Sequence, residues 1–259
     1  MSDKTLVRFV QYFGFFLNRI IEIFKLNRVG LLEKIWIGLY FRYKQKFEKQ
    51  TITWINQNKE ILGTVIDVGA GFGFYTWVVA KSQPSAQIYA FEPDPQNFQR
   101  LKKTVSKLSK TSGIVIYQKA VSKESSTLFL KRDLYNPANH QTVFNENGLT
   151  SVSSKSLDDF CEEYRIVPTL IKIDVQGHER YVLEGAKNVI ANKKPALLIE
   201  FDFTTENENA FFCWNFMKKN GYVAYKITKN GETRRVLELP ESDTYFDLVF
   251  KLDPNPSSR

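Results

Sequence analysis

The sequence predicts an open α/β fold in which helices cover both faces of a mostly parallel, seven-stranded sheet. Short apolar runs typical of buried strands alternate with stretches at helical spacing along most of the 259 residues. Four of these runs end in an acidic residue, namely Asp67, Glu92, Asp174 and Glu200. Because the carboxyl ends of parallel strands meet at one edge of the sheet, where ligands bind, we expect the functional site there.

The first strand leads into a turn rich in glycine. Residues 65–68 are mostly β-branched, and the three glycines Gly69, Gly71 and Gly73 follow at once. Glycine allows a sharp turn and lets a ligand lie against the backbone, and the following helix offers free N–H groups. A nicotinamide dinucleotide fingerprint would need a glycine at the position of Phe74. We therefore expect a different nucleotide-type cofactor.

Two carboxylates frame this turn. Asp67 would repel a pyrophosphate but can hold an ammonium group, and Glu92 can accept hydrogen bonds from two ribose hydroxyls. A ligand with an ammonium at an amino-acid end, a central part that lies against the glycine backbone and a ribose has the features of S-adenosylmethionine. We therefore predict S-adenosylmethionine as the cofactor. The residues expected to bind it are Asp67, Gly69, Ala70, Gly71, Gly73, Tyr75, Thr76, Glu92, Pro93, Asp94, Lys119 and Ala120.

The rest of the chain alternates between helices and strands. We expect helices over residues 74–81, 96–108, 157–164, 179–190 and 211–219. We expect strands over residues 87–91, 114–118, 169–174, 195–200, 222–227 and 245–251, with an extra strand over 127–131. The last two strands of the sheet are joined by an Asn-Gly turn and a polar stretch. Residues 133–150 are polar and irregular, which predicts a functional loop that we interpret as part of a substrate lid.

Several segments together resemble one known family. They are Val-Ile-Asp-Val-Gly-Ala-Gly-Phe-Gly-Phe-Tyr, Ala-Phe-Glu-Pro-Asp-Pro, Lys-Ala-Val-Ser, Ser-Leu-Asp-Asp, Ile-Lys-Ile-Asp-Val-Gln-Gly-His-Glu and Leu-Glu-Gly-Ala. This set is similar to the FkbM family of S-adenosylmethionine-dependent methyltransferases, from about Thr64 to Phe203. The resemblance implies a Rossmann-like methyltransferase fold and methyl transfer to an oxygen of a sugar, lipid or secondary metabolite, without an obligatory metal. The family often has Glu where this chain has Gln176.

Methyl transfer to a hydroxyl gains from a base that takes the proton in the transition state. The chain has two histidines, His178 just after the strand that ends at Asp174, and His140 in the predicted lid. We predict His178 as the base and His140 as the second candidate, with Asp174 orienting the imidazole or binding the acceptor. For His178 the structural alternative is a residue hydrogen-bonded to backbone at the start of a helix.

The acceptor hydroxyl is expected to lie among polar side chains of the lid and the strand ends. The predicted substrate-binding residues are Asn136, Asn139, Glu179 and Glu200. Helix capping is the structural alternative for Asp174 and Glu179. We predict no metal site, although Asp174, Glu200 and a histidine together are a conceivable magnesium site.

The net charge of +8 is concentrated at the N-terminus. Residues 1–60 hold eleven Lys or Arg and five Asp or Glu, a balance of +6. This charge lies outside the predicted site, and no Asn/Asp-Pro-Pro-Tyr/Phe signature of base-flipping enzymes occurs, so we expect no nucleic-acid partner. A nucleic-acid methyltransferase and a module that binds the cofactor without catalysis stay as alternatives. Cys161 and Cys213 have no C-x-x-C partner, which indicates a cytoplasmic protein without disulfide or zinc.

Three parts are predicted along the chain: a helical extension over residues 1–60, the methyltransferase domain over 61–252 and a flexible tail over 253–259. In the extension, residues 6–26 and 31–58 have helical spacing, and the apolar run of the former is shorter than the ~20 residues that span a bilayer. Either residues 6–26 pack on the protein, which their continuous aromatic stripe favours, or they lie in a membrane interface and make the protein membrane-associated. The sequence does not predict the oligomeric state.

Overall fold

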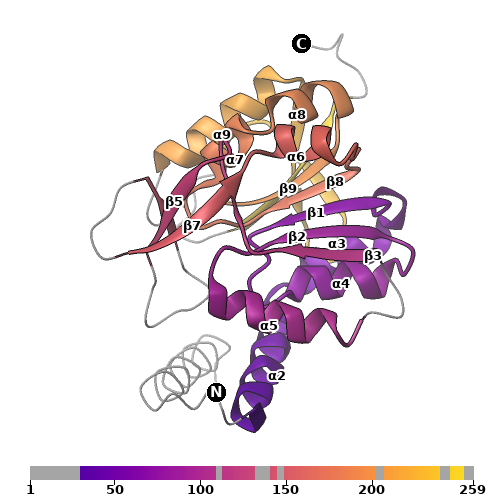
Figure 1. Cartoon of the computed structure of the whole chain (residues 1–259). Coiled ribbons are helices and arrows are strands. Elements are labelled where there is room, and N and C mark those ends of the chain that lie inside the picture. Colours follow the sequence, from indigo (N-terminus) through magenta and orange to yellow (C-terminus); the bar gives the residue numbers. More distant parts are fainter. Residues whose placement is uncertain are drawn as a thin grey trace.

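The computed structural model describes residues 30–108, 113–131, 141–144, 149–201, 207–239 and 246–253. Its main sheet has eight strands in the order β11-β10-β12-β9-β8-β1-β2-β3, of which Figure 1 labels β9, β8, β1, β2 and β3. Their bounds are β1 Thr64–Val68, β2 Gln87–Phe91, β3 Gly113–Tyr117, β8 Leu170–Ile173, β9 Ala196–Phe201, β10 Tyr222–Ile227, β11 Thr233–Val236 and β12 Phe246–Leu252. Strands β3, β2, β1, β8 and β9 are parallel, whereas β12, β10 and β11 join antiparallel.

The predicted Rossmann-like α/β fold with a mostly parallel sheet is confirmed, but the predicted number of seven strands is wrong. The eighth strand of the main sheet is β11, which follows the turn at Asn230 and Gly231 and pairs with β10 alone. Its sequence Thr-Arg-Arg-Val is mostly exposed, because β11 lies at the edge of the sheet. An edge strand of this kind carries no run of apolar residues, so the pattern that predicts buried strands misses it.

Helices cover both faces of the main sheet (Figure 1). The helices are α2 Gly30–Phe47, α3 Lys49–Gln57, α4 Phe74–Ser82, α5 Pro95–Val105, α6 Leu157–Glu163, α7 Glu179–Glu184, α8 Lys187–Lys193 and α9 Asn207–Lys219, with a short 3₁₀ turn at Lys59–Ile61. Side chains alternate along β1, so that Ile66 and Val68 join a core with α6 to α9. Val65 lies on the opposite face, in a core with α3 and α4. Asp67 shares that face and is a carboxylate within an apolar layer.

Several predicted elements have different bounds from those expected, and two helices differ most. The helix predicted over residues 179–190 is divided into α7 and α8 at Gly185, where a Cβ would be 2.1 Å from the Ser122 carbonyl oxygen. The Asp158 carboxylate accepts hydrogen bonds from the backbone N–H groups of Asn188 and Val189 in the first turn of α8. The helix predicted from residue 211 begins at Asn207.

A second, four-stranded sheet lies beside the main one and has the order β4-β7-β5-β6. Its strands are β4 Ala120–Val121, β5 Thr127–Lys131, β6 Gln141–Val143 and β7 Thr150–Lys155. Of these, β5 matches the predicted extra strand, whereas β6 lies inside the predicted irregular loop and β7 was not predicted. Residues 132–140 and 145–148 fall outside the described residues, and so do the predicted site residues Asn136, Asn139 and His140.

Helices α2 and α3 precede the first strand and pack on α4 through aromatic side chains. Phe41 of α2 lies 5.4 Å from Phe74 and 5.7 Å from Trp77, measured between ring centroids. None of the described helices is long and apolar enough to cross a membrane. The predictions for residues 6–26 and for the tail beyond residue 253 lie outside the described part of the chain.

Candidate active site

The glycine turn connects β1 to α4 at the carboxyl edge of the main sheet. Gly69, Gly71 and Gly73 all have positive φ angles, of 78°, 55° and 83°, which L side chains rarely adopt. A Cβ on Gly69 would lie 1.9 Å from the carbonyl oxygen of Asp174, so glycine is also needed for the close approach of the two strand ends. A Cβ on Gly71 would meet no atom within 4 Å, which marks the open side of the turn.

Glu92 is joined to this turn by hydrogen bonds. Its carboxylate accepts from the backbone N–H of Gly71 and of Asp94, both at 2.8 Å. The side chain is buried, and burial raises the pKa of Glu92 to about 8. Each carboxylate oxygen has a further lone pair, so Glu92 can still accept hydrogen bonds from ligand hydroxyls. Asp94 has a structural role as well, because it caps α5 by accepting from the N–H groups of Gln96 and Asn97.

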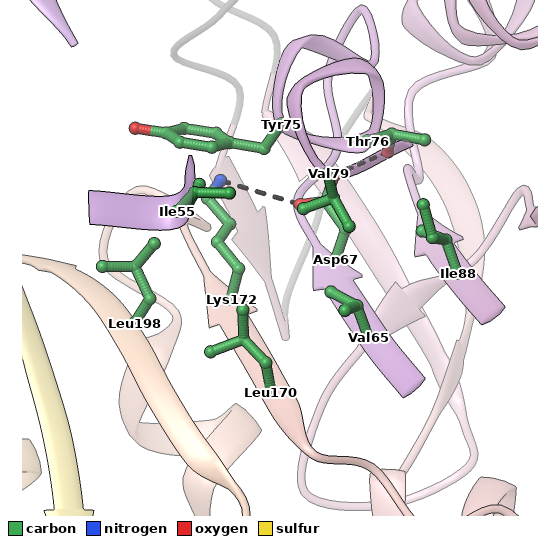
Figure 2. Close-up of a pocket in the computed structure, with 10 residues that line it drawn as sticks. All are labelled: Ile55, Val65, Asp67, Tyr75, Thr76, Val79, Ile88, Leu170, Lys172 and Leu198. Carbon is green, nitrogen blue, oxygen red and sulfur yellow. Dashed lines mark hydrogen bonds and ion pairs between the residues drawn. The ribbon is translucent and has the colours of Figure 1, made fainter. Parts of the chain in front are cut away.

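Asp67 points toward α4 and lies beside a small internal cavity (Figure 2). Thr76 Oγ1 donates to Asp67 Oδ2 at 2.7 Å, and Lys172 Nζ lies 3.9 Å from Oδ1. Although Asp67 is only 2% exposed, Oδ1 accepts no hydrogen bond from the described residues. Burial raises the pKa of Asp67, and the charge of Lys172 opposes this effect. Tyr75 lines the same cavity, and Lys172 Nζ lies 4.7 Å from its ring centroid.

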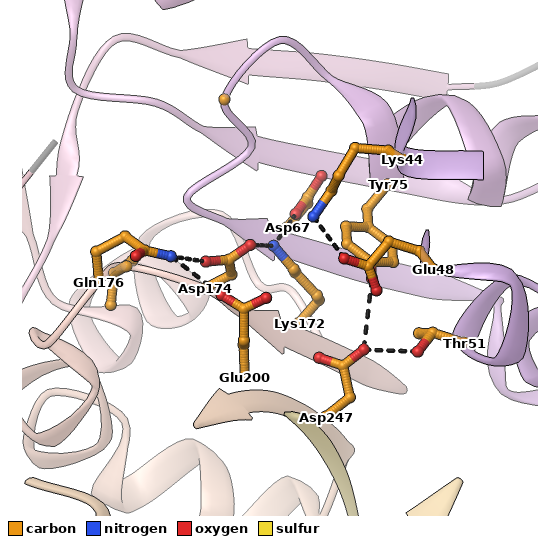
Figure 3. Close-up of polar contacts among 12 residues, drawn as sticks. Lys44, Glu48, Thr51, Asp67, Tyr75, Lys172, Asp174, Gln176, Glu200 and Asp247 are labelled. Atoms are coloured by element: carbon orange, nitrogen blue, oxygen red, sulfur yellow. Dashed lines mark hydrogen bonds and ion pairs between the residues drawn. The ribbon is translucent and has the colours of Figure 1, made fainter. Parts of the chain in front are cut away.

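Charged side chains from five elements meet beside the glycine turn (Figure 3). We call this group the acid–lysine network, and its charged members are Lys44, Glu48, Asp67, Lys172, Asp174, Glu200 and Asp247. Lys172 Nζ lies 3.0 Å from Asp174 Oδ2. Gln176 Nε2 donates to Asp174 Oδ1 at 2.8 Å and to Glu200 Oε2 at 3.0 Å, so it joins the ends of β8 and β9.

The network continues to the helices that precede the first strand. Lys44 Nζ lies 2.7 Å from Glu48 Oε1, and the Tyr75 hydroxyl donates to Glu48 Oε2 at 3.0 Å. Thr51 Oγ1 donates to Asp247 Oδ2 at 2.6 Å, and the Tyr75 hydroxyl lies 3.5 Å from the same oxygen. Side chains of α2 and α3 are therefore part of the polar contacts at this edge of the sheet.

Carboxyl groups outnumber lysines in the network, five to two. Burial and then the charge of Asp174 raise the pKa of Glu200 well above its usual value. Burial alone would raise the pKa of Asp174 too, but Lys172 and Lys44 hold it well below the usual range. Burial, followed by the charge of Glu48, raises the pKa of Asp247 to about 7. The excess of carboxyl groups makes this region favourable for a bound cation.

His178, the predicted base, lies at the start of α7 and is 3% exposed. Its Nε2 is 3.0 Å from Ser122 Oγ, and its ring is 4.7 Å from the Tyr181 ring and 5.6 Å from the Phe144 ring. Burial lowers the pKa of His178 to about 4, so the imidazole is neutral near pH 7. Its described contacts are with β6, the Ser122 region and α7, and none of them is with Asp174.

Glu179 is buried, and its carboxylate accepts hydrogen bonds from other groups of the protein. It accepts hydrogen bonds from the backbone N–H of Val175 and Gly177 and from Asn209 Nδ2 at 2.6 Å. These bonds shape the turn after β8 and do not cap α7, whose N-cap residue makes no side-chain cap hydrogen bond. Ala120, predicted to bind the cofactor, packs in the small sheet and is 3% exposed, and the neighbouring Lys119 is partly exposed.

Sequence reasoning missed four members of the network: Lys44, Glu48, Lys172 and Asp247. Two of them had a visible signal, because Lys172 interrupts the apolar strand run before Asp174 and Asp247 interrupts the last strand. A charged residue inside a buried strand needs a partner, which predicts a polar site. Lys44 and Glu48 are four residues apart, a spacing that occurs on many exposed helices and so gave no signal.

The parallel sheet, the glycine turn and the acid at the end of the neighbouring strand define a Rossmann-like fold of the kind found in methyltransferases. The family model "Methyltransferase FkbM domain" matches residues 67–224, and the chain belongs to this family. The structure is similar to methyltransferase FkbM from Methylobacillus flagellatus KT, with a TM-score of 0.52 and 18% identity, over 73% of this chain and 44% of that one.

Two relatives have names that describe their reactions. The chain is 25% identical to 2-O-methyltransferase NoeI of Sinorhizobium fredii over 148 residues, which is 50% of this chain and 60% of the relative. It is 25% identical to hexuronic acid methyltransferase AglP of Haloferax volcanii over 144 residues, which is 55% of this chain and 58% of the relative. The matched region thus spans about three fifths of each relative's length.

Proposed function

We propose that the protein is an S-adenosylmethionine-dependent O-methyltransferase that acts on a sugar hydroxyl. The observation that carries this proposal is the glycine turn whose open side, at Gly71, is hydrogen-bonded to the Glu92 carboxylate. Such a turn can place the ribose of the cofactor beside the Glu92 carboxylate and let the cofactor lie against the backbone at Gly71. The family and the two named relatives support methyl transfer as the reaction class.

The charges beside the turn suit this cofactor. S-adenosylmethionine carries a sulfonium and an ammonium group, and the acid–lysine network has an excess of carboxyl groups to receive them. Asp67 adds a buried oxygen without a hydrogen bond on the same side. Glu92 would hold the ribose, the glycine turn would lie against the middle of the cofactor, and Asp67 and Asp174 would favour its cationic end. When bound, the cofactor supplies the methyl group.

The acceptor is proposed to be a neutral sugar hydroxyl at the partly exposed ends of β8 and β9. Asp174, Gln176 and Glu200 are partly exposed there, and their amide and carboxyl groups can hydrogen-bond a polyol. The same excess of acids would repel a carboxylate on the acceptor. We therefore expect neutral glycosides to be methylated faster than the corresponding hexuronic acids.

Isothermal titration tests cofactor binding, with S-adenosylmethionine as the ligand and NAD as the control. Methyl transfer is then measured with a labelled methyl group and methyl glycosides of neutral hexoses and hexuronic acids. Binding of S-adenosylmethionine without NAD binding, followed by labelling of a glycoside, supports the proposal. Failure to bind S-adenosylmethionine contradicts the cofactor, and binding without transfer to any glycoside contradicts the sugar acceptor.

A further inference from the structure

Gln176 joins the ends of two neighbouring strands of the main sheet (Figure 3). Its Nε2 lies 2.8 Å from Asp174 Oδ1, directly after β8, and 3.0 Å from Glu200 Oε2, near the end of β9. Only the amide nitrogen suits a position between two carboxyl groups, because it carries two N–H donors while the amide oxygen can only accept. Both donors of the side chain are thus used within the protein.

The backbone of Gln176 is held in a left-handed conformation. Gln176 has a φ of 53°, and Gly177 follows with a φ of 97°. The buried Glu179 carboxylate accepts from the N–H groups of both neighbours, Val175 at 3.1 Å and Gly177 at 3.0 Å. Asn209 Nδ2 donates to the same carboxylate at 2.6 Å. A left-handed residue other than glycine is unfavourable, and such strain is concentrated at sites where the side chain has a function.

Asp174, Gln176 and Glu200 form what we call the carboxyl–amide rim, and all three are partly exposed. Toward a ligand this rim offers hydrogen-bond acceptors, because both amide donors are used. Burial and the charge of Asp174 raise the pKa of Glu200, and a proton on Glu200 is hydrogen-bonded to Asp174. The two lysines of the network, Lys172 and Lys44, lie 3.0 Å and 2.7 Å from carboxyl oxygens of the protein. A molecule at the rim is therefore bound best through hydrogen atoms that it donates itself.

We propose that Gln176 determines the acceptor specificity, because its amide bridge makes the carboxyl–amide rim a site for a neutral diol, namely two free hydroxyls on neighbouring carbons of one sugar. The inference rests on the proposed function and deepens it by naming the substrate class. The bridge holds both acids within 3.0 Å of one nitrogen, so two neighbouring hydroxyls can donate to them at the same time. A methyl ether or a fluorine in place of one hydroxyl cannot donate and leaves an acid without its partner.

The charge of residue 176 sets the preference for a neutral acceptor. Gln176 adds no charge between Asp174 and Glu200, whereas Gln176→Glu removes both amide donors and adds a third carboxyl group. Neighbouring carboxyl groups attract a cation, so this variant should favour an amino sugar, whose ammonium group is charged and donates. A residue that only shaped the turn would affect all acceptors alike. The ratio of rates between acceptors therefore separates the two roles.

Three methyl glycosides test the proposal: the best neutral substrate, and its analogues with fluorine or an amine in place of the hydroxyl next to the methylated one. NMR of the product identifies the methylated position. In wild type we expect kcat/KM to be about 10²-fold lower for the fluorine analogue than for the parent. In Gln176→Glu, kcat/KM for the amino analogue relative to the parent should rise about tenfold. Equal values for parent and fluorine analogue overturn the diol site, and an unchanged ratio in Gln176→Glu overturns the role of Gln176.

Glycine variants separate specificity from folding. Gln176→Gly keeps the left-handed backbone and removes the bridge, and Arg165→Gly is the matched control at an exposed residue with the same φ of 53°. Both variants should fold, because glycine adopts this φ without strain, and melting curves check this. We expect kcat/KM for the parent glycoside to fall about tenfold in Gln176→Gly and to stay at the wild-type value in Arg165→Gly. Wild-type kinetics in Gln176→Gly also overturn the proposal.

Binding separates this inference from the proposed methyl transfer. The protein is saturated with S-adenosylhomocysteine, the cofactor without its methyl group, and titrated with the parent glycoside and with analogues that carry fluorine at each hydroxyl in turn. NMR of the glycosides measures their affinities. Tighter binding of the parent than of an analogue, with no methyl transfer by wild type, contradicts the reaction and supports the diol site. Equal binding of the parent and all analogues contradicts the diol site, even when wild type transfers the methyl group.

Discussion

At the scale of single residues, Glu92 joins the end of one strand to the turn that follows another. Both of its carboxylate oxygens accept backbone N–H groups, and the side chain is buried with a pKa of about 8. The protonation state of Glu92 therefore depends on which hydrogen-bond donors surround it. A ligand with two hydroxyl donors would favour the ionised, accepting form.

We expect Glu92→Gln to weaken S-adenosylmethionine binding by about 1.5–3 kcal/mol, because the amide has one accepting oxygen instead of two. The measurement is isothermal titration of wild type and variant at equal pH. Glu60→Gln, a change of the same kind at an exposed position of the 3₁₀ turn, is the control. Equal affinity of wild type, Glu92→Gln and Glu60→Gln for S-adenosylmethionine would show that Glu92 does not bind the cofactor.

His178 gives a prediction about acid stability. Its pKa is about 4 in the folded protein and near 6.5 in an unfolded chain, so below pH 6.5 the unfolded state binds a proton that the folded state does not. This group therefore costs stability progressively as the pH falls from 6.5 to 4, by about 3 kcal/mol in total. His178→Gln should lose less stability than wild type over this range, as measured by urea unfolding. If the unfolding free energies of wild type and His178→Gln fell equally between pH 6.5 and pH 4, this effect of His178 on stability would be contradicted.

Among residues, those that follow a simple rule could be predicted from the sequence. The glycine turn and the acids Asp67, Glu92, Asp174 and Glu200 could be placed because strand ends of a parallel sheet share one edge. The side chains of Lys44 and Glu48 could not, because their place in the site depends on how α2 docks against α4. Docking of this kind leaves no local pattern.

At the scale of elements, α2 supports the glycine turn from outside. The Phe72 ring is 1% exposed and lies 6.5 Å from Trp36 and 4.5 Å from Tyr40, both on α2, and 4.7 Å from the Arg100 guanidinium of α5. Thr104 Oγ1 donates to the Phe72 carbonyl oxygen at 2.7 Å. Glu33 of α2 pairs with Arg100 and Lys103, which fixes α2 against α5.

We expect Trp36→Ala to lower the free energy of unfolding by about 3–5 kcal/mol and to weaken cofactor binding, because the cavity it leaves releases Phe72 and the turn. Chemical denaturation and cofactor titration measure the two effects. Ile35→Ala, at a side chain that is 48% exposed on the same helix, should change the unfolding free energy by about 0.5 kcal/mol or less. If Trp36→Ala is destabilised but binds the cofactor with normal affinity, then the packing of α2 does not support the glycine turn in cofactor binding.

Elements with strong apolar periodicity could be predicted, and those defined by tertiary contacts could not. The strands β1, β2, β8 and β9 are largely buried on both faces and read as mostly apolar runs. In contrast, β7 reads Thr-Ser-Val-Ser-Ser-Lys with Val152 and Ser154 as its buried positions, and β11 is an exposed edge. The break between α7 and α8 lies at Gly185, whose close approach to the Ser122 carbonyl is a tertiary contact that no local pattern reveals.

At the scale of the whole molecule, charge and sheet order are the main features. The +6 balance of residues 1–60 accounts for most of the net charge of +8. Basic residues beside an aromatic stripe are compatible with a membrane surface, yet the continuous stripe in residues 6–26 favours packing on protein.

We therefore expect that the full-length chain does not float with vesicles of neutral or anionic lipid at physiological salt. Flotation on a density gradient measures this, and a chain without residues 1–29 serves as the comparison. Co-flotation of the full-length chain with anionic vesicles, weakened by added salt and lost in the shortened chain, would contradict packing. It would also indicate a lipid or lipid-linked sugar as the acceptor.

The strand order has a consequence for synthesis of the chain. Strand β12, near the C-terminus, lies between β9 and β10, which precede it in sequence. Until residues 246–252 have been synthesised, β10 and β11 have no neighbour that connects them to the parallel strands. Asp247 lies on β12, so its contacts with Thr51 and Tyr75 form only after that strand has docked. The polar contacts at the carboxyl edge of the sheet therefore depend on the strand of the main sheet that is synthesised last.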